Sequence, residues 1–129
     1  MTGATPDRPP IVASDTAGLP APVAADLMEA AACCAAGAYR GAGLLARRAV
    51  EQVAVLCRVP LEAKTLDQKL GWLLSAGHLP RAAAADARAA RDAGNASAHG
   101  GETITREEAD AGVRAALAVA RAVFLPPAS

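Results

Sequence analysis

The chain has 129 residues, which suits one domain, and its 13 basic and 13 acidic side chains cancel to a formal charge of zero. Any binding of nucleic acid would therefore depend on a local basic patch, because the molecule as a whole offers no attracting field. Apolar residues make up 53% of the chain but aromatic residues only 2%, so a dense core requires helices whose backbones approach closely. This composition indicates an all-α protein.

The sequence predicts a cytoplasmic location. The first residues lack the basic head and apolar run of a secretory signal. No uninterrupted apolar segment reaches the ~20 residues that span a bilayer, so no membrane association is expected. The cysteines Cys33, Cys34 and Cys57 have no metal-ligand spacing, and their odd number suits a reducing compartment. We expect no metal and no other cofactor.

The first half of the chain predicts a tail followed by one long helix. Residues 1–22 are rich in Pro, Gly, Thr and Asp without a period, which predicts a flexible tail. Pro22 suits the first turn of a helix that continues to Val59, and Pro60 ends it. The glycines in its middle predict a kink or a close helix contact there.

The second half predicts three further helices. Thr65 and Gln68 form a capping box for a helix that stops at Gly77. Pro80 opens the next helix, which the Gly100–Gly101 pair must end. A second capping box at Thr105 opens the last helix, which runs to Phe124. We therefore expect an antiparallel bundle of four main helices over residues 23–124, followed by a short tail at 125–129.

Near the end of the third predicted helix, polar side chains recur on one face. Arg88, Asp92, Asn95 and His99 follow at steps of four, three and four residues, and Arg91 lies at the edge of this stripe. The imidazole can accept or donate a proton near neutral pH. The arginines can hold phosphate oxygens and stabilise developing negative charge. These groups suit phosphodiester chemistry on RNA without a metal.

The same residues resemble the HEPN superfamily of nucleotide-binding domains. RDAGNASAH reads as arginine, a polar residue, six further residues and histidine. Within HEPN, the chain is most similar to a bacterial family of unknown function. That family pairs R-x-x-E, here Arg48 and Glu51, with G-N-x-x-x-H, here Gly94 to His99. The resemblance covers roughly residues 24–124 and implies an all-α bundle.

The resemblance also implies residue roles and partners. Arg91 would stabilise phosphate, Asp92 would be its polar neighbour, and His99 would act as the acid and base. Supporting side chains around Asn95 and His99 would be Arg48, Glu51 and Arg88. HEPN domains commonly form homodimers with the motif helices facing each other. Some members of the related family are fused to restriction-enzyme subunits, so an antitoxin or restriction-system partner is implied as well.

Three interpretations of the polar cluster remain open at this point. In the first, the chain is a homodimeric RNA-associated or protein-interaction module of bacterial defence, without catalysis. In the second, it is a metal-independent endoribonuclease with Arg91 and His99 at a dimer cleft. In the third, the bundle is purely structural, with Gly94 as a close-packing point and the Asn95 amide bonded to Arg48 or Glu51.

Overall fold

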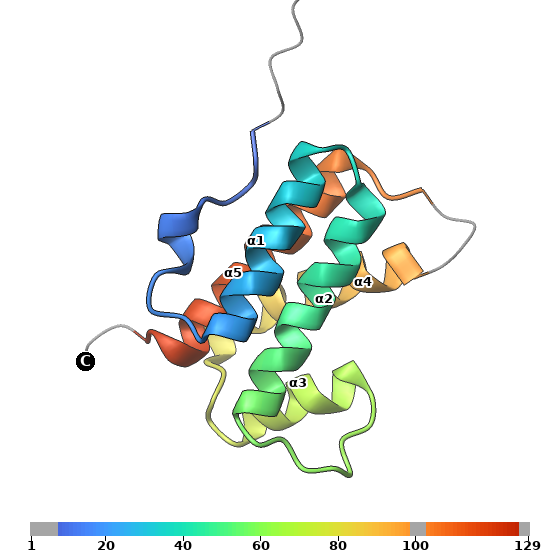
Figure 1. Cartoon of the computed structure of the whole chain (residues 1–129). Coiled ribbons are helices and arrows are strands. Elements are labelled where there is room, and N and C mark those ends of the chain that lie inside the picture. The colour runs from blue at the N-terminus through green and yellow to red at the C-terminus, as the bar shows by residue number, and fades with distance from the viewer. Residues whose placement is uncertain (1–7, 99–102, 127–129) are drawn as a thin grey trace, which may run out of the picture.

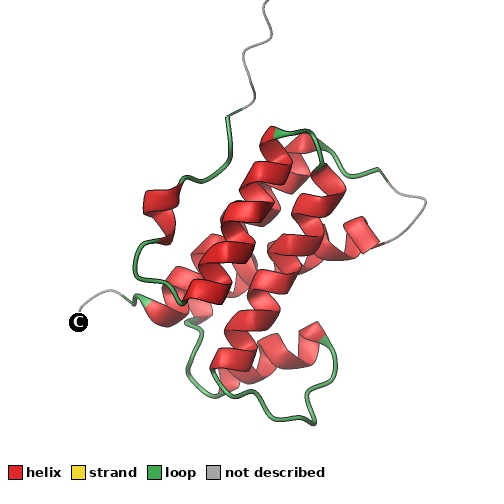
Figure 2. Cartoon of the chain, in the orientation of Figure 1, coloured by secondary structure: helices red, strands yellow, loops and turns green. Residues whose placement is uncertain are grey.

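The computed structural model describes residues 8–98 and 103–126. These residues are helical apart from the connections, and no strand occurs among them, which confirms the all-α prediction (Figures 1 and 2). The elements in chain order are η1 (Ala13–Thr16), α1 (Ala21–Ala35), α2 (Tyr39–Leu56), α3 (Leu66–Ser75), η2 (Arg81–Ala83), α4 (Ala84–Ala98) and α5 (Arg106–Phe124).

The predicted helix from Pro22 to Val59 is wrong, because it divides into α1 and α2. Gly37 has φ of +81°, a left-handed conformation that glycine adopts without steric cost. Its amide donates to the Cys34 carbonyl at 3.1 Å, and the Ala38 amide donates to the Cys33 carbonyl at 2.8 Å. These two bonds form a Schellman motif, which ends α1 and lets α2 fold back against it.

Part of the predicted N-terminal tail packs on the domain. Ile11 is only 3% exposed and belongs to the core, and Leu19 packs against the same core. The Arg121 guanidinium of α5 donates to the Asp15 carbonyl at 2.9 Å. The tail boundary at residue 22 is therefore wrong for residues 11–20, because apolar side chains in this segment find partners. Residues 1–7 and 127–129 lie outside the described part of the chain.

Both predicted capping boxes are confirmed. The Gln68 amide donates to Thr65 Oγ1 at 3.1 Å, and the Thr65 amide donates to Gln68 Oε1 at 3.2 Å. At the start of α5, Thr105 and Glu108 exchange the same two bonds at 3.1 and 3.0 Å. Backbone and side-chain bonds from Thr105 lower the pKa of Glu108. Each box satisfies amides that would lack partners in the first helical turn.

The core is built from alanine, valine and leucine, and helices approach closely where one of them presents a glycine. A Cβ atom at Gly112 of α5 would lie 2.5 Å from the Ala93 Cβ of α4. At Gly43 of α2, a Cβ would overlap the Ser97 hydroxyl and lie 2.8 Å from the Ala93 carbonyl oxygen. The expected backbone proximity is therefore present where α4 packs on α2 and where it packs on α5.

Candidate functional site

The predicted polar face of α4 lies at the protein surface. Arg88, Asp92 and Asn95 are exposed, while Arg91 is half-buried at the edge of the same stripe. His99 lies outside the described residues, so its predicted role is untested. The three exposed residues share one side of the helix, as their spacing predicts, but they face different neighbours.

Asn95 is connected to α2 and α3 by a chain of polar contacts. Arg47 Nη1 of α2 donates to Asn95 Oδ1 at 3.1 Å, and Arg47 Nε donates to Glu51 Oε1 at 3.2 Å. The same Glu51 carboxylate lies 3.7 Å from Lys69 Nζ of α3. Three helices are thereby linked through one guanidinium and one carboxylate.

Gly94 explains how Arg47 reaches Asn95. A Cβ atom at Gly94 would lie 2.5 Å from Arg47 Cβ, 2.8 Å from its Cδ and 3.0 Å from its Cγ. Because those distances are too short for real atoms, only glycine leaves room for the arginine stem to cross α4. The predicted close-packing role of Gly94 is confirmed, with Arg47 as the packing partner.

Arg91 is held by two carboxylates. Its Nη1 donates to Asp67 Oδ1 of α3 at 2.8 Å, and its Nε donates to Asp92 Oδ1 at 3.0 Å. These bonds raise the pKa of Arg91 above its already high value, Asp67 first and Asp92 second. The guanidinium therefore stays charged and is oriented toward the junction of α3 and α4.

The two arginines meet at one small cavity of about 110 Å³ between α2, α3 and α4. We call this the arginine cavity. It is lined by Arg47, Thr65, Leu66, Asp67, Arg91 and Asn95. Two guanidinium groups, one amide and one carboxylate therefore converge on a space open to solvent.

Arg48 does not occupy its predicted place. Its Nε lies 3.5 Å from Asp26 Oδ2 of α1, and 66% of its side chain is exposed. The reason is geometric: successive helical residues point about 100° apart, so Arg47 faces α4 while Arg48 faces α1. The prediction that Arg48 supports Asn95 is wrong, and Glu51 acts on Asn95 only through Arg47. Burial raises the pKa of Asp26, and Arg48 lowers it in part.

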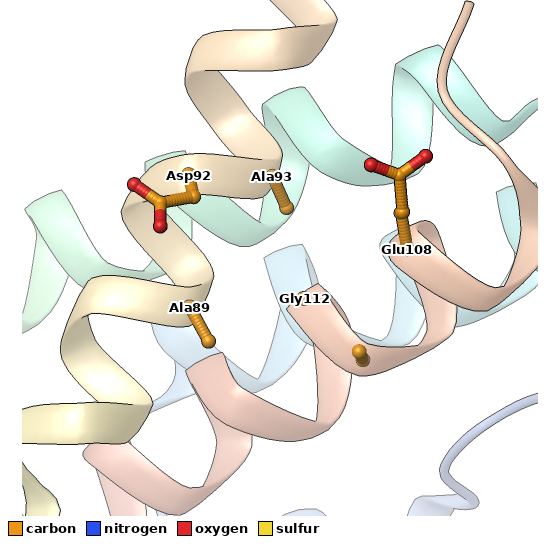
Figure 3. Close-up of a pocket in the computed structure, with 6 residues that line it drawn as sticks. Ala89, Asp92, Ala93, Glu108 and Gly112 are labelled. Atoms are coloured by element: carbon orange, nitrogen blue, oxygen red, sulfur yellow. The ribbon is translucent and has the colours of Figure 1, made fainter.

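The remaining two predicted residues border other hollows. Asp92 lies at a groove of about 180 Å³ between α4 and α5, where Ala89 and Ala93 face Gly112. Figure 3 shows both alanines directed at α5, while the Asp92 carboxylate turns to the other side of α4, where Arg91 binds it. Arg88 lines a hollow beside the end of α3.

Sequence reasoning missed Arg47, Asp67 and Lys69. The four-residue spacing of Arg47 and Glu51 is that of a helical ion pair and could have identified the first. No sequence signal identifies Asp67 as the partner of Arg91, because that contact joins residues 24 positions apart. Arg40 is a further addition, since its Nε donates to the Ser97 carbonyl at 2.7 Å in the last turn of α4.

Residues 28–127 match the family model described as Domain of unknown function (DUF4145). The chain belongs to this family. The match covers α2 to α5 and the second half of α1. No curated protein and no solved structure matches the chain.

Two further properties of the DUF4145 domain concern membranes and metals. No helix among the described residues has the length and apolar character that a bilayer crossing requires. Residues 8–98 and 103–126 contain no group of three or more His, Cys, Asp or Glu placed to hold a metal ion. All three cysteines are free thiols.

Proposed function

We propose that this DUF4145 domain is a HEPN-like homodimer that associates with RNA in the bacterial cytoplasm without cleaving it. The setting we propose is defence, restriction or toxin–antitoxin control, with an antitoxin or a restriction subunit as protein partner. The observation that carries the proposal is the convergence of Arg47 and Arg91, from two helices, on the arginine cavity.

The chemistry of the cavity favours a phosphate group as its ligand. Guanidinium groups form forked hydrogen bonds to phosphate oxygens, and Arg47 is held in place by Glu51 on one side and Asn95 on the other. A preorganised arginine loses less conformational entropy on binding than a mobile one. Because the chain has zero net charge, attraction of RNA depends on a local group of cations, and Arg47 and Arg91 form one such group.

Association without cleavage is favoured by the surroundings of Arg91. Two carboxylates already neutralise its charge at 2.8 and 3.0 Å. To stabilise a phosphorane-like transition state, the guanidinium would have to exchange at least one carboxylate for the phosphate. A ground-state phosphodiester carries less negative charge, and Arg47 together with the N–H groups of Arg91 that the carboxylates leave free can bind it without such an exchange.

RNA titrations with matched variants test the proposal. Fluorescence anisotropy of a labelled single-stranded RNA should show binding by the wild type and at least fivefold weaker binding by Arg47→Ala and by Arg91→Ala. Arg114→Ala removes an exposed arginine of α5 and should bind as the wild type does. Equal affinity in all four proteins, with melting curves showing that each is folded, would refute the proposed site.

A metal-independent endoribonuclease is the second candidate. The observation in its favour is that the two cavity arginines flank Asn95, which precedes His99 by four residues in the sequence. This function requires RNA cleavage that a chelator does not affect, products with 2′,3′-cyclic phosphate ends, and loss of cleavage in His99→Ala. Intact RNA after incubation with the purified wild type excludes it. A bundle with a purely structural cluster would instead show Asn95→Ala affecting only the melting temperature.

A further inference from the structure

Large apolar side chains are exposed mainly along α2 and just after it. Those above one-third exposure among the described residues are Val12, Leu44, Val55, Leu56 and Leu61. Three of the five belong to α2, and Leu61 lies in the connection that follows it. In Figure 1, α2 runs along the near side of the bundle, so this face is not covered by another element of the chain.

The exposed side of α2 has a regular pattern. Leu44, Arg48, Glu51 and Val55 follow at steps of four, three and four residues, which places them on one side of the helix. The core residues of α2 point the opposite way, toward α1, α4 and α5. We call these four residues the α2 seam. Its order is apolar, basic, acidic, apolar.

We infer that the α2 seam binds the α2 seam of a second copy, with the two helices antiparallel and related by a two-fold axis. In this arrangement Leu44 meets the partner's Val55, and Arg48 meets the partner's Glu51. Each contact occurs twice, as a two-fold interface requires.

The charges select this orientation. A parallel pairing would oppose Arg48 to the partner's Arg48 and Glu51 to the partner's Glu51, which is unfavourable at both positions. The antiparallel pairing opposes unlike charges. Arg48 keeps 66% of its side chain exposed beside its partner Asp26, and Glu51 keeps 37% exposed beside Arg47 and Lys69, so each retains exposed surface for a contact across the seam. The seam is thus complementary to itself in one direction only.

A hollow at the end of the seam provides room for the apolar contact. About 360 Å³ of open space lies beside Val55, and Val59, Pro60 and Leu61 supply its apolar walls. Leu44 is 42% exposed and Val55 57%. Insertion of Leu44 beside the partner's Val55 would remove both from water, a packing that resembles a coiled-coil knob in its hole.

This interface rests on the proposed homodimer and specifies it. It differs from the arrangement that the HEPN resemblance implies, in which the motif helices face each other, because it leaves the polar face of α4 free for RNA. Glu51 connects the two regions, since it belongs to the seam and also binds Arg47 at the arginine cavity. Dimer formation would thereby place an arginine cavity on each side of the seam.

The test combines oligomeric state with directed cross-linking. Light scattering should give a dimer for the wild type and for Val12→Asp, a control at a 51% exposed position outside both the seam and its hollow. Leu44→Asp and Val55→Asp should be monomers with wild-type circular dichroism, because both positions are exposed. In mild oxidant, Leu44→Cys and Val55→Cys should form disulfide-linked dimers only when the two proteins are mixed.

Each alternative outcome overturns the inference in a distinguishable way. A wild-type monomer at micromolar concentration removes both this interface and the proposed homodimer. A dimer that survives Leu44→Asp and Val55→Asp removes the α2 interface but leaves the homodimer of the proposed function intact. Cross-linking of Leu44→Cys with itself would indicate a parallel pairing and would contradict the antiparallel one.

Discussion

Replacing Gly94 by alanine tests the packing that brings Arg47 to Asn95. The added methyl group would lie 2.5 Å from Arg47 Cβ, an atom fixed to the α2 backbone, so a rotamer change cannot relieve the clash. Overpacking of this kind typically costs about 1–3 kcal/mol. Alanine regains about 1 kcal/mol of helix propensity over glycine. The two effects together give a loss of about 0–2 kcal/mol, and because the helices themselves must separate, we expect the upper part of this range, about 1–2 kcal/mol.

Gly71→Ala is the matched control, because it places the same methyl group on a helix with open space around it. Gly71 is exposed in α3, and a Cβ atom added there would meet no side chain or neighbouring element within 4 Å. This variant should gain about 1 kcal/mol from helix propensity alone. For a domain of this size, about 4 °C of melting temperature corresponds to 1 kcal/mol.

Thermal melts of the two variants beside the wild type provide the measurement. Gly94→Ala should melt about 4–8 °C lower and Gly71→Ala about 4 °C higher. Gly94→Ala should also bind RNA more weakly, because the displaced Arg47 loses its bond to Asn95. If Gly94→Ala melts at or above the wild-type temperature, the close contact between α2 and α4 at this position is refuted.

Three further predictions concern single side chains. Burial raises the pKa of Asp26 above its usual 3.8, so the stability that this group contributes is complete below pH 3.8 and is lost as the pH rises through its folded-state pKa. Asp26→Asn should therefore unfold at higher urea than the wild type at pH 7, and an equal midpoint there would contradict this. Arg58 has φ of +64°, a left-handed backbone conformation that is strained for arginine and free for glycine. Arg58→Gly should therefore stabilise the protein by about 0.5–1 kcal/mol in urea unfolding. A loss of stability would show that the backbone at Arg58 is not strained. Burial raises the pKa of Cys34 to about 12, so iodoacetamide at pH 8 should label it only after unfolding; rapid labelling of the native protein would show that it is accessible.

The starts of α3 and α5 could be predicted because their determinants are local. Thr65 with Gln68, and Thr105 with Glu108, satisfy amides within the same turn, so four residues contain all the required information. The helix break at Gly37 is different. Glycine in an alanine-rich segment is compatible with a kink or a close contact as well as a turn, and the packing of α2 back on α1 decides between them.

The sequence predicted which site residues share one face of α4, but it did not predict their partners on other helices. The spacing of Arg88, Asp92 and Asn95 places them on the exposed side of α4 without knowledge of any neighbour. The partners of this face come from α2 and α3, and the choice of Arg47 over Arg48 depends on a rotation of about 100° around α2. Composition and spacing do not fix that rotation, because it is set by which alanines of α2 enter the core.

The salt dependence of RNA affinity tests the role of the arginine cavity most directly. Two phosphate contacts on a single strand predict a slope of about −1.4 for the logarithm of affinity against the logarithm of salt concentration, or about sevenfold weaker binding between 50 and 200 mM salt. Removal of one contact in Arg91→Ala should reduce the slope to about −0.7. A wild-type slope near zero, or the same slope in both proteins, would contradict the account.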